Sequence, residues 1–226
     1  MNTEEYGGMK KFIVGLFVVI LTSLGCTEVQ RQQVVSILST DQYSAGAQPV
    51  QQAATVSNVK QAVMEAGDTP LIVASRQGDL KTVQTLLASG VDVNASNEKG
   101  TTALMAASKE GHADVIKALA THKKLDLNAM DWNSDTALML AVQNNRLEAV
   151  KALLQAGADP NVTKAGMTAL IAASYKGYAD ITRALLEGGA NIDWVDENNE
   201  SALDVAINTN KPAVVAVLRE YQNKKM

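Results

Sequence analysis

The 226-residue sequence predicts an all-α fold, a solenoid of about five helix-turn-helix units. The first observation behind this prediction is a Thr/Ser-x-Leu phrase that recurs at spacings of 33, 34, 32 and 33 residues. It begins at Thr69, Thr102, Thr136, Thr168 and Ser201. The second is a residue that commonly ends a helix, nine positions later each time: Gly78, Gly111, Asn145, Gly177 and Asn210. A fixed period of this length is typical of repeat proteins, whose units bury their apolar faces against one another.

The residues at the two ends of each first helix explain why a helix should form there. A Thr or Ser hydroxyl can accept a hydrogen bond from a free N–H group of the first turn, and Pro70 stands where that turn has an N–H to spare. Gly and Asn are the residues that most readily adopt the left-handed conformation at a helix end. Each first helix should therefore end at its Gly or Asn.

A second helix is predicted in each unit by apolar residues at three- and four-residue spacing. Ile181, Leu185 and Leu186 illustrate the pattern, which places them in one buried stripe. Three of these runs are followed by a glycine that should end the helix: Gly90, Gly157 and Gly189.

The openings TPLIVA, TALMAA, TALMLA, TALIAA and SALDVA, with the turns GVDVN, GADPN and GANID, resemble the ankyrin repeat. The resemblance covers residues 68–221 and implies paired antiparallel helices with projecting finger loops. The sequence departs from the family where a His normally follows the Leu: Ile72, Met105, Met139, Ile171 and Asp204. One unit is a residue longer within 121–125 and another a residue shorter after Asn161, both in expected loops.

The first residues of the chain predict a signal peptide over residues 1–25. Lys10 and Lys11 precede the apolar run 12–24, which is short for a membrane span. The single cysteine, Cys26, follows directly, and this arrangement resembles the lipidation site of bacterial lipoproteins, although Ser23 stands where that family usually has Leu. An ordinary cleaved signal and an uncleaved anchor are the alternatives.

This N-terminal pattern predicts where the protein resides and how it is divided. By the same resemblance, lipidated Cys26 followed by Thr27 favours a periplasm-facing lipoprotein of the bacterial outer membrane, with a soluble periplasmic or secreted protein as the alternative. The Gln-, Ser- and Thr-rich segment 26–57 should be a flexible tether, and residues 58–67 a helix that caps the solenoid. The ankyrin-like domain is expected over residues 68–222.

Composition and motif searches point away from catalysis. A net charge of −4 gives no basic field for nucleic acid, and no catalytic triad, metal cluster or phosphate-binding loop is apparent, so no cofactor is expected. His112 fits a structural place at the start of a second helix, and His122 an exposed loop. The carboxylates Asp92, Asp126 and Asp159 follow the repeat period, which indicates a role in turns.

The ankyrin resemblance implies a binding surface of fingers and a concave wall of first helices. The expected fingers are residues 95–99, 130–134, 163–165 and 195–199. Eight residues on this surface are candidates for contacting a partner: Arg76, Lys109, Glu110, Met130, Trp132, Tyr175, Lys176 and Trp194. Tyr and Trp are frequent in binding hot spots, although Trp194 could equally pack on the adjoining finger.

These observations predict a non-enzymatic, monomeric module that is tethered in the bacterial envelope and binds another protein. An inhibitor or immunity protein that occludes a toxin or an envelope enzyme is the alternative.

Overall fold

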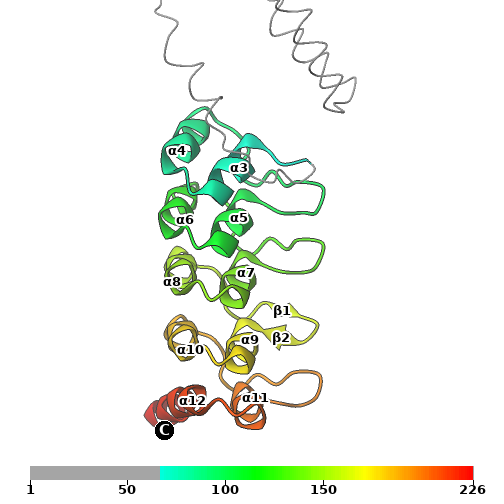
Figure 1. Cartoon of the computed structure of the whole chain (residues 1–226), viewed down its shortest axis with the longest axis vertical. Coiled ribbons are helices and arrows are strands. Elements are labelled where there is room, and N and C mark those ends of the chain that lie inside the picture. The colour runs from blue at the N-terminus through cyan, green and yellow to red at the C-terminus, as the bar shows by residue number, and fades with distance from the viewer. Residues whose placement is uncertain (1–66, 226) are drawn as a thin grey trace, which may run out of the picture. The chain divides into compact units, whose positions relative to one another are not determined.

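The computed structural model describes residues 67–225. The predicted signal peptide and tether, and the capping helix except for Gly67, lie outside these residues. In the described part, ten helices form five consecutive pairs (Figure 1). The pairs are α3 (Pro70–Gln77) with α4 (Leu80–Ala88), α5 (Ala103–Glu110) with α6 (Ala113–Ala120), α7 (Ala137–Gln143) with α8 (Leu147–Ala156), α9 (Ala169–Lys176) with α10 (Ala179–Glu187), and α11 (Ala202–Asn208) with α12 (Pro212–Lys225). The predicted fold class is confirmed.

Each first helix begins at the predicted cap. In all five, the Thr or Ser hydroxyl accepts a hydrogen bond of 3.2 to 3.3 Å from the N–H three residues later. Pro70 is the first helical residue of α3, and Pro212 the first of α12. A missing N–H is harmless at that place because no intrahelical acceptor is available to it.

The predicted helix ends are also confirmed. The five closing residues have φ between 54° and 92°, and they are Gly78, Gly111, Asn145, Gly177 and Asn210. In this conformation the N–H groups after the helix turn back to its last free carbonyls, as when Asp79 N–H donates to Ala74 O at 3.0 Å. The chain can then reverse within two residues and begin the second helix.

The helix pairs stack so that like helices touch. First helices α3, α5, α7, α9 and α11 form one layer, and second helices α4, α6, α8, α10 and α12 form the other (Figure 1). Large side chains between the layers and between the repeats, such as Leu104, Leu138, Leu170 and Leu185, are fully buried. This apolar core runs through all five repeats and holds the first helices at a regular spacing.

The turns between repeats form a ladder of hydrogen bonds. Asp92, Asp126 and Asp159 each accept from the N–H two residues later, at 2.8 to 3.0 Å, which confirms their turn role. The Asn two residues after each Asp accepts from the next turn at 2.7 to 2.9 Å, as Asn94 does from Asp126 N–H. Each turn thereby fixes the position of its neighbour.

The position that holds His in the family is apolar and buried in the first four repeats, at Ile72, Met105, Met139 and Ile171. In the last repeat it is Asp204, which is exposed and accepts a hydrogen bond from the N–H of the cap residue Ser201 at 2.9 Å. Polar links between repeats come from elsewhere. His112 Nε2 lies 3.1 Å from Arg76 O, and Arg146 Nε donates to Lys109 O at 3.2 Å. The structural role expected of His112 is therefore confirmed.

Candidate protein-binding surface

Four finger loops project from the layer of first helices, on the right in Figure 1. We call them finger I (96–101), finger II (130–135), finger III (163–167) and finger IV (195–200). Each is a short β-hairpin: Ser96 pairs with Thr102, Met130 with Thr136 and Val195 with Ser201. In finger III, β1 (Thr163–Lys164) pairs with β2 (Met167–Thr168). The fingers and the C-terminal ends of the first helices together form what we call the finger-side surface.

Fingers I, II and IV are held by one side chain each. A side-chain oxygen of Asn97, Asp131 or Asp196 accepts two backbone N–H groups of its own loop, at 2.8 to 3.0 Å. These hydrogen bonds satisfy the backbone of the turn within the finger itself. The loops are therefore ordered before any partner arrives, which reduces the entropy lost on binding.

Finger III closes differently because it is one residue shorter. Lys164 pairs with Met167 across the two residues Ala165 and Gly166, which have φ of 47° and 74°. Two left-handed residues match the twist of a tight hairpin. The missing residue after Asn161 thus falls in a loop, as expected, and the helices on either side keep their places.

Neighbouring fingers contact one another through both tryptophans. Trp132 N–H donates to Lys99 O at 3.1 Å, and its ring lies against Gly100, where an added Cβ would stand 3.1 Å from Cδ1. The indole N–H of Trp194 donates to Gly166 O at 3.0 Å. Trp194 therefore packs on the adjoining finger, as one of its two interpretations anticipated, while Trp132 remains 78% exposed.

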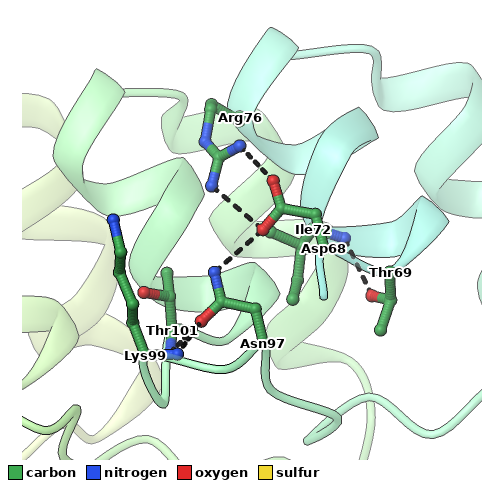
Figure 2. A network of polar contacts seen from close by, with 7 residues as sticks. All are labelled: Asp68, Thr69, Ile72, Arg76, Asn97, Lys99 and Thr101. Atoms are coloured by element: carbon green, nitrogen blue, oxygen red, sulfur yellow. Dashed lines mark hydrogen bonds and ion pairs between the residues drawn. The ribbon is translucent and has the colours of Figure 1, made fainter. Parts of the chain in front are cut away.

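Arg76, a predicted contact residue, belongs to a network inside the fold (Figure 2). Its guanidinium forms an ion pair with Asp68, whose side chain is fully buried, and only 18% of the Arg76 side chain is exposed. Asn97 of finger I donates to Asp68 at 2.9 Å and accepts from Lys99 and Thr101 N–H. The network ties finger I to the first repeat, so that Arg76 has a structural role that the sequence did not reveal.

The same two positions form polar pairs in other repeats. They are the residue directly before the cap of the first helix and the residue eight later. In the third repeat, Asp135 accepts from Gln143 at 2.8 Å and from Lys164 of finger III at 2.6 Å. In the fifth repeat, Glu200 accepts from Asn208 at 2.6 Å. Polar side chains at this pair of positions therefore fit the fold well.

The fourth repeat has Met167 and Tyr175 at these positions, and they are 44% and 57% exposed. Tyr175 was a predicted contact residue, whereas Met167 was missed. Comparing the residue before each cap across the repeats would have found it, because only there is that position apolar: Asp68, Thr101, Asp135, Met167 and Glu200.

Large apolar side chains are concentrated on the finger-side surface. Seven are exposed among the residues that the structure describes, and six of them lie on the fingers, beside them or at the end of α9. These six are Met130, Trp132, Met167, Tyr175, Trp194 and Val195. The predicted contact residues Lys109, Glu110 and Lys176 are also exposed there, and Glu110 lies 4.0 Å from Arg146 in a surface ion pair.

The described residues show little that suggests chemistry. No three His, Cys, Asp or Glu side chains within residues 67–225 are placed to hold a metal ion. His122 is half-buried in a shallow hollow between α4 and α6 beside Leu87, which makes it less exposed than expected. In the same part of the chain, every helix is too short or too polar to cross a membrane.

Comparisons with known proteins agree with this architecture. The chain is 37% identical over 76 residues to the ankyrin repeat domain-containing protein SAT10 of Stachybotrys chartarum, which is 31% of this chain and 4% of that protein. It is 29% identical over 143 residues to the ankyrin repeat and KH domain-containing protein mask-1 of Caenorhabditis elegans, which is 63% of this chain and 5% of that protein. It is 44% identical over 52 residues to the probable E3 ubiquitin-protein ligase XBOS32 of rice, which is 23% of this chain and 10% of that protein.

These relatives are much longer proteins, and the chain spans a tenth or less of each. The family model for ankyrin repeats (3 copies) matches residues 29–131, 71–164 and 161–226, well over half of the chain. With five capped helix pairs, left-handed helix ends and finger hairpins at the same period, the chain belongs to the ankyrin-repeat family.

Proposed function

We propose that this chain is a non-enzymatic module that binds another protein through its finger-side surface. Ankyrin repeats generally mediate protein–protein binding. A solenoid leaves its surface positions free to vary, because only the core and the turns are dictated by the repeat. The surface residues are therefore where this chain's own specificity is encoded.

The observation that carries the proposal is that, of the seven large apolar side chains exposed within residues 67–225, six lie on or beside the fingers or at the end of α9. Water-exposed apolar side chains that gather on one face mark sites of interaction. Trp132 is the strongest of them, because a tryptophan that is 78% exposed on a well-ordered loop offers a large area with few rotamers to immobilise. Tyr175 offers a similar anchor at the end of α9.

The proposal also places the module in the bacterial envelope. Its support is the sequence of residues 10–26, in which two lysines and an apolar run precede the single cysteine. A lipid on Cys26 and the segment 26–57 as a tether would hold the repeats on the periplasmic side of the outer membrane. The module would act there as a monomer.

The binding proposal is tested after cross-linking in intact cells and capture of the partner through a C-terminal tag. Trp132→Ala and Tyr175→Ala, titrated separately with the identified partner, should each weaken binding by about 30-fold, which corresponds to about 2 kcal/mol for a hot spot. Both variants should unfold in urea at the wild-type midpoint. Wild-type affinity in both variants would show that the partner contacts another part of the chain.

A matched control comes from the second-helix layer. Lys151→Ala removes an exposed side chain of α8 whose ion pair with Glu148 lies on the surface. It should alter neither stability nor affinity, because an exposed pair of this kind contributes about 1 kcal/mol at most. A loss of affinity in Lys151→Ala equal to that in Trp132→Ala would contradict the assignment of the binding surface.

A further inference from the structure

The fourth repeat departs from a pattern that the fold itself accepts in other repeats. Asp135 with Gln143 and Glu200 with Asn208 show that a polar pair fits directly before the cap and eight residues later. Met167 and Tyr175 replace this pair with two large apolar side chains that remain about half exposed. Core packing does not explain them, because their side chains are not in the core. An exposed apolar pair at such a place is better explained by a contact outside the chain.

Finger IV borders this apolar pair. Gly166, which directly precedes Met167, accepts a hydrogen bond from the Trp194 indole at 3.0 Å. The Glu197 side chain also lies against Gly166, since an added Cβ there would stand 2.8 Å from Glu197 Cγ. Met167 thus directly follows a residue that contacts both the Trp194 ring and the Glu197 side chain of finger IV.

The charges on and beside finger IV are negative. Residues 191–210 contain five acidic residues and no Lys or Arg: Asp193, Asp196, Glu197, Glu200 and Asp204. Within residues 67–225, neither Asp196, Glu197 nor Glu200 takes part in an ion pair. Two lysines stand at the end of α9: Lys176 itself and Lys211, whose side chain lies against Gly177, while Lys164 of finger III is paired with Asp135. The negative charge is therefore concentrated on finger IV, beside Gly166 and Met167.

We infer that Met167, Tyr175, Trp194 and finger IV bind an exposed polypeptide segment in which Lys or Arg side chains stand beside large apolar ones. The apolar side chains of the segment would cover Met167 and Tyr175, and its cations would face the carboxylates of finger IV. Complementary charge steers such a segment and rejects acidic ones. Met adapts to varied apolar shapes, and aromatic faces attract cations. This inference rests on the proposed function and specifies the chemistry of the partner.

Synthetic peptides of equal length test the chemistry directly. A fluorescein-labelled peptide of Lys, Leu and Ser is titrated with the full chain by fluorescence anisotropy, beside a second peptide with Glu for each Lys and a third with Ser for each Leu. The Lys–Leu peptide should bind at least about tenfold more tightly than either of the others. Its affinity should fall as salt is raised, because exposed charges are screened.

Two variants test whether the peptide binds at Met167, Tyr175 and finger IV. Met167→Asp with Tyr175→Gln copies the pair Asp135–Gln143 of the third repeat, so the variant should fold normally. Asp196→Asn with Glu197→Gln and Glu200→Gln removes the charges of finger IV, and Asn97 shows that an asparagine holds the equivalent turn. Each variant should bind the Lys–Leu peptide at least about tenfold more weakly than the wild type does. The urea midpoint of each variant should equal that of the wild type.

A charge-matched control lies on the second helices. Asp114→Asn with Glu148→Gln and Glu187→Gln removes the same number of carboxylates from α6, α8 and α10, and it should leave peptide affinity unchanged. If this control loses as much peptide affinity as the finger IV variant, the effect comes from the net charge of the protein and the inference is overturned.

Three further outcomes would overturn it. They are no binding of the Lys–Leu peptide, equal binding of the Glu peptide, and full affinity in the Met167→Asp/Tyr175→Gln variant. A wild-type dimer that this variant turns into a monomer would assign the surface to a second copy of the chain instead. The two proposals can be told apart with the captured partner. If Trp132→Ala loses affinity for that partner while Met167→Asp/Tyr175→Gln keeps it, the proposed function stands and this inference is rejected. If both of these variants keep full affinity for the partner, the proposed function is rejected as well.

Discussion

Removing the Arg76 guanidinium should cost more stability than removing any comparable surface cation, because its partner Asp68 is fully buried (Figure 2). Arg76→Met keeps most of the aliphatic stem and deletes the charge. Breaking a buried ion pair from one side costs about 3–5 kcal/mol, since the other charge remains in a poorly solvated place. Asp68 keeps the hydrogen bond from Asn97 at 2.9 Å, so we expect the lower end, about 3 kcal/mol.

Arg146→Met is the internal control for this prediction. Arg146 also links two repeats, but its Nη2 is 4.0 Å from Glu110, and the two side chains are 44% and 40% exposed. Its loss should cost about 1 kcal/mol or less. The measurement is urea denaturation of the full chain followed by far-ultraviolet circular dichroism, with the slope m compared before the free energies of unfolding. Equal losses in the two variants would refute the reasoning from burial.

A second substitution separates charge from packing. Adding Asp68→Asn to Arg76→Met replaces the buried carboxylate with a neutral amide that can still accept from Asn97. The double variant should recover at least about 1 kcal/mol of the loss, because a buried carboxylate no longer remains after the Arg76 cation is removed. A double variant as unstable as Arg76→Met alone would show that the loss came from packing.

Three other predictions concern the core, a helix cap and the N-terminus. Leu185→Ala, at a fully buried site, should lower the free energy of unfolding by about 2–5 kcal/mol, and a loss below about 1 kcal/mol in urea would contradict this. The Asp79 carboxylate caps α4 by accepting a hydrogen bond from Thr82 N–H at 3.1 Å, so Asp79→Ala should cost about 1 kcal/mol at pH 7. Hydrogen bonding from Thr82 lowers the pKa of Asp79 below its ordinary value of 3.8, so this contribution is present above pH 3.8 and is lost as pH falls through the folded-state pKa. A wild-type advantage that is constant down to the most acidic pH would refute it. Cys26→Ser should abolish palmitate labelling and release the protein from membranes, and unchanged labelling and fractionation would exclude the lipoprotein hypothesis.

The sequence by itself determined the number of repeats, the ends of the first helices and the turns between repeats. These features depend on contacts within a few residues along the chain. The Thr69 hydroxyl caps the helix that begins at the next residue, Gly78 adopts the left-handed conformation that a residue without Cβ favours, and Asp92 accepts a hydrogen bond from an N–H two positions on. The same local pattern recurs in all five repeats at the same spacing. This recurrence is why the sequence alone predicts the helix ends and the turns.

Only the tertiary structure decided which surface residues are free to meet a partner. Asp68 meets Asn97 across 29 residues, and Trp194 meets Gly166 across 28, so their roles depend on how adjacent repeats stack. That stacking assigned Arg76 to the fold, tied Trp194 to its neighbouring finger and left Trp132 and Met167 exposed. The exposure of a side chain depends on how two neighbouring repeats contact each other. The sequence pattern within one repeat therefore does not predict it.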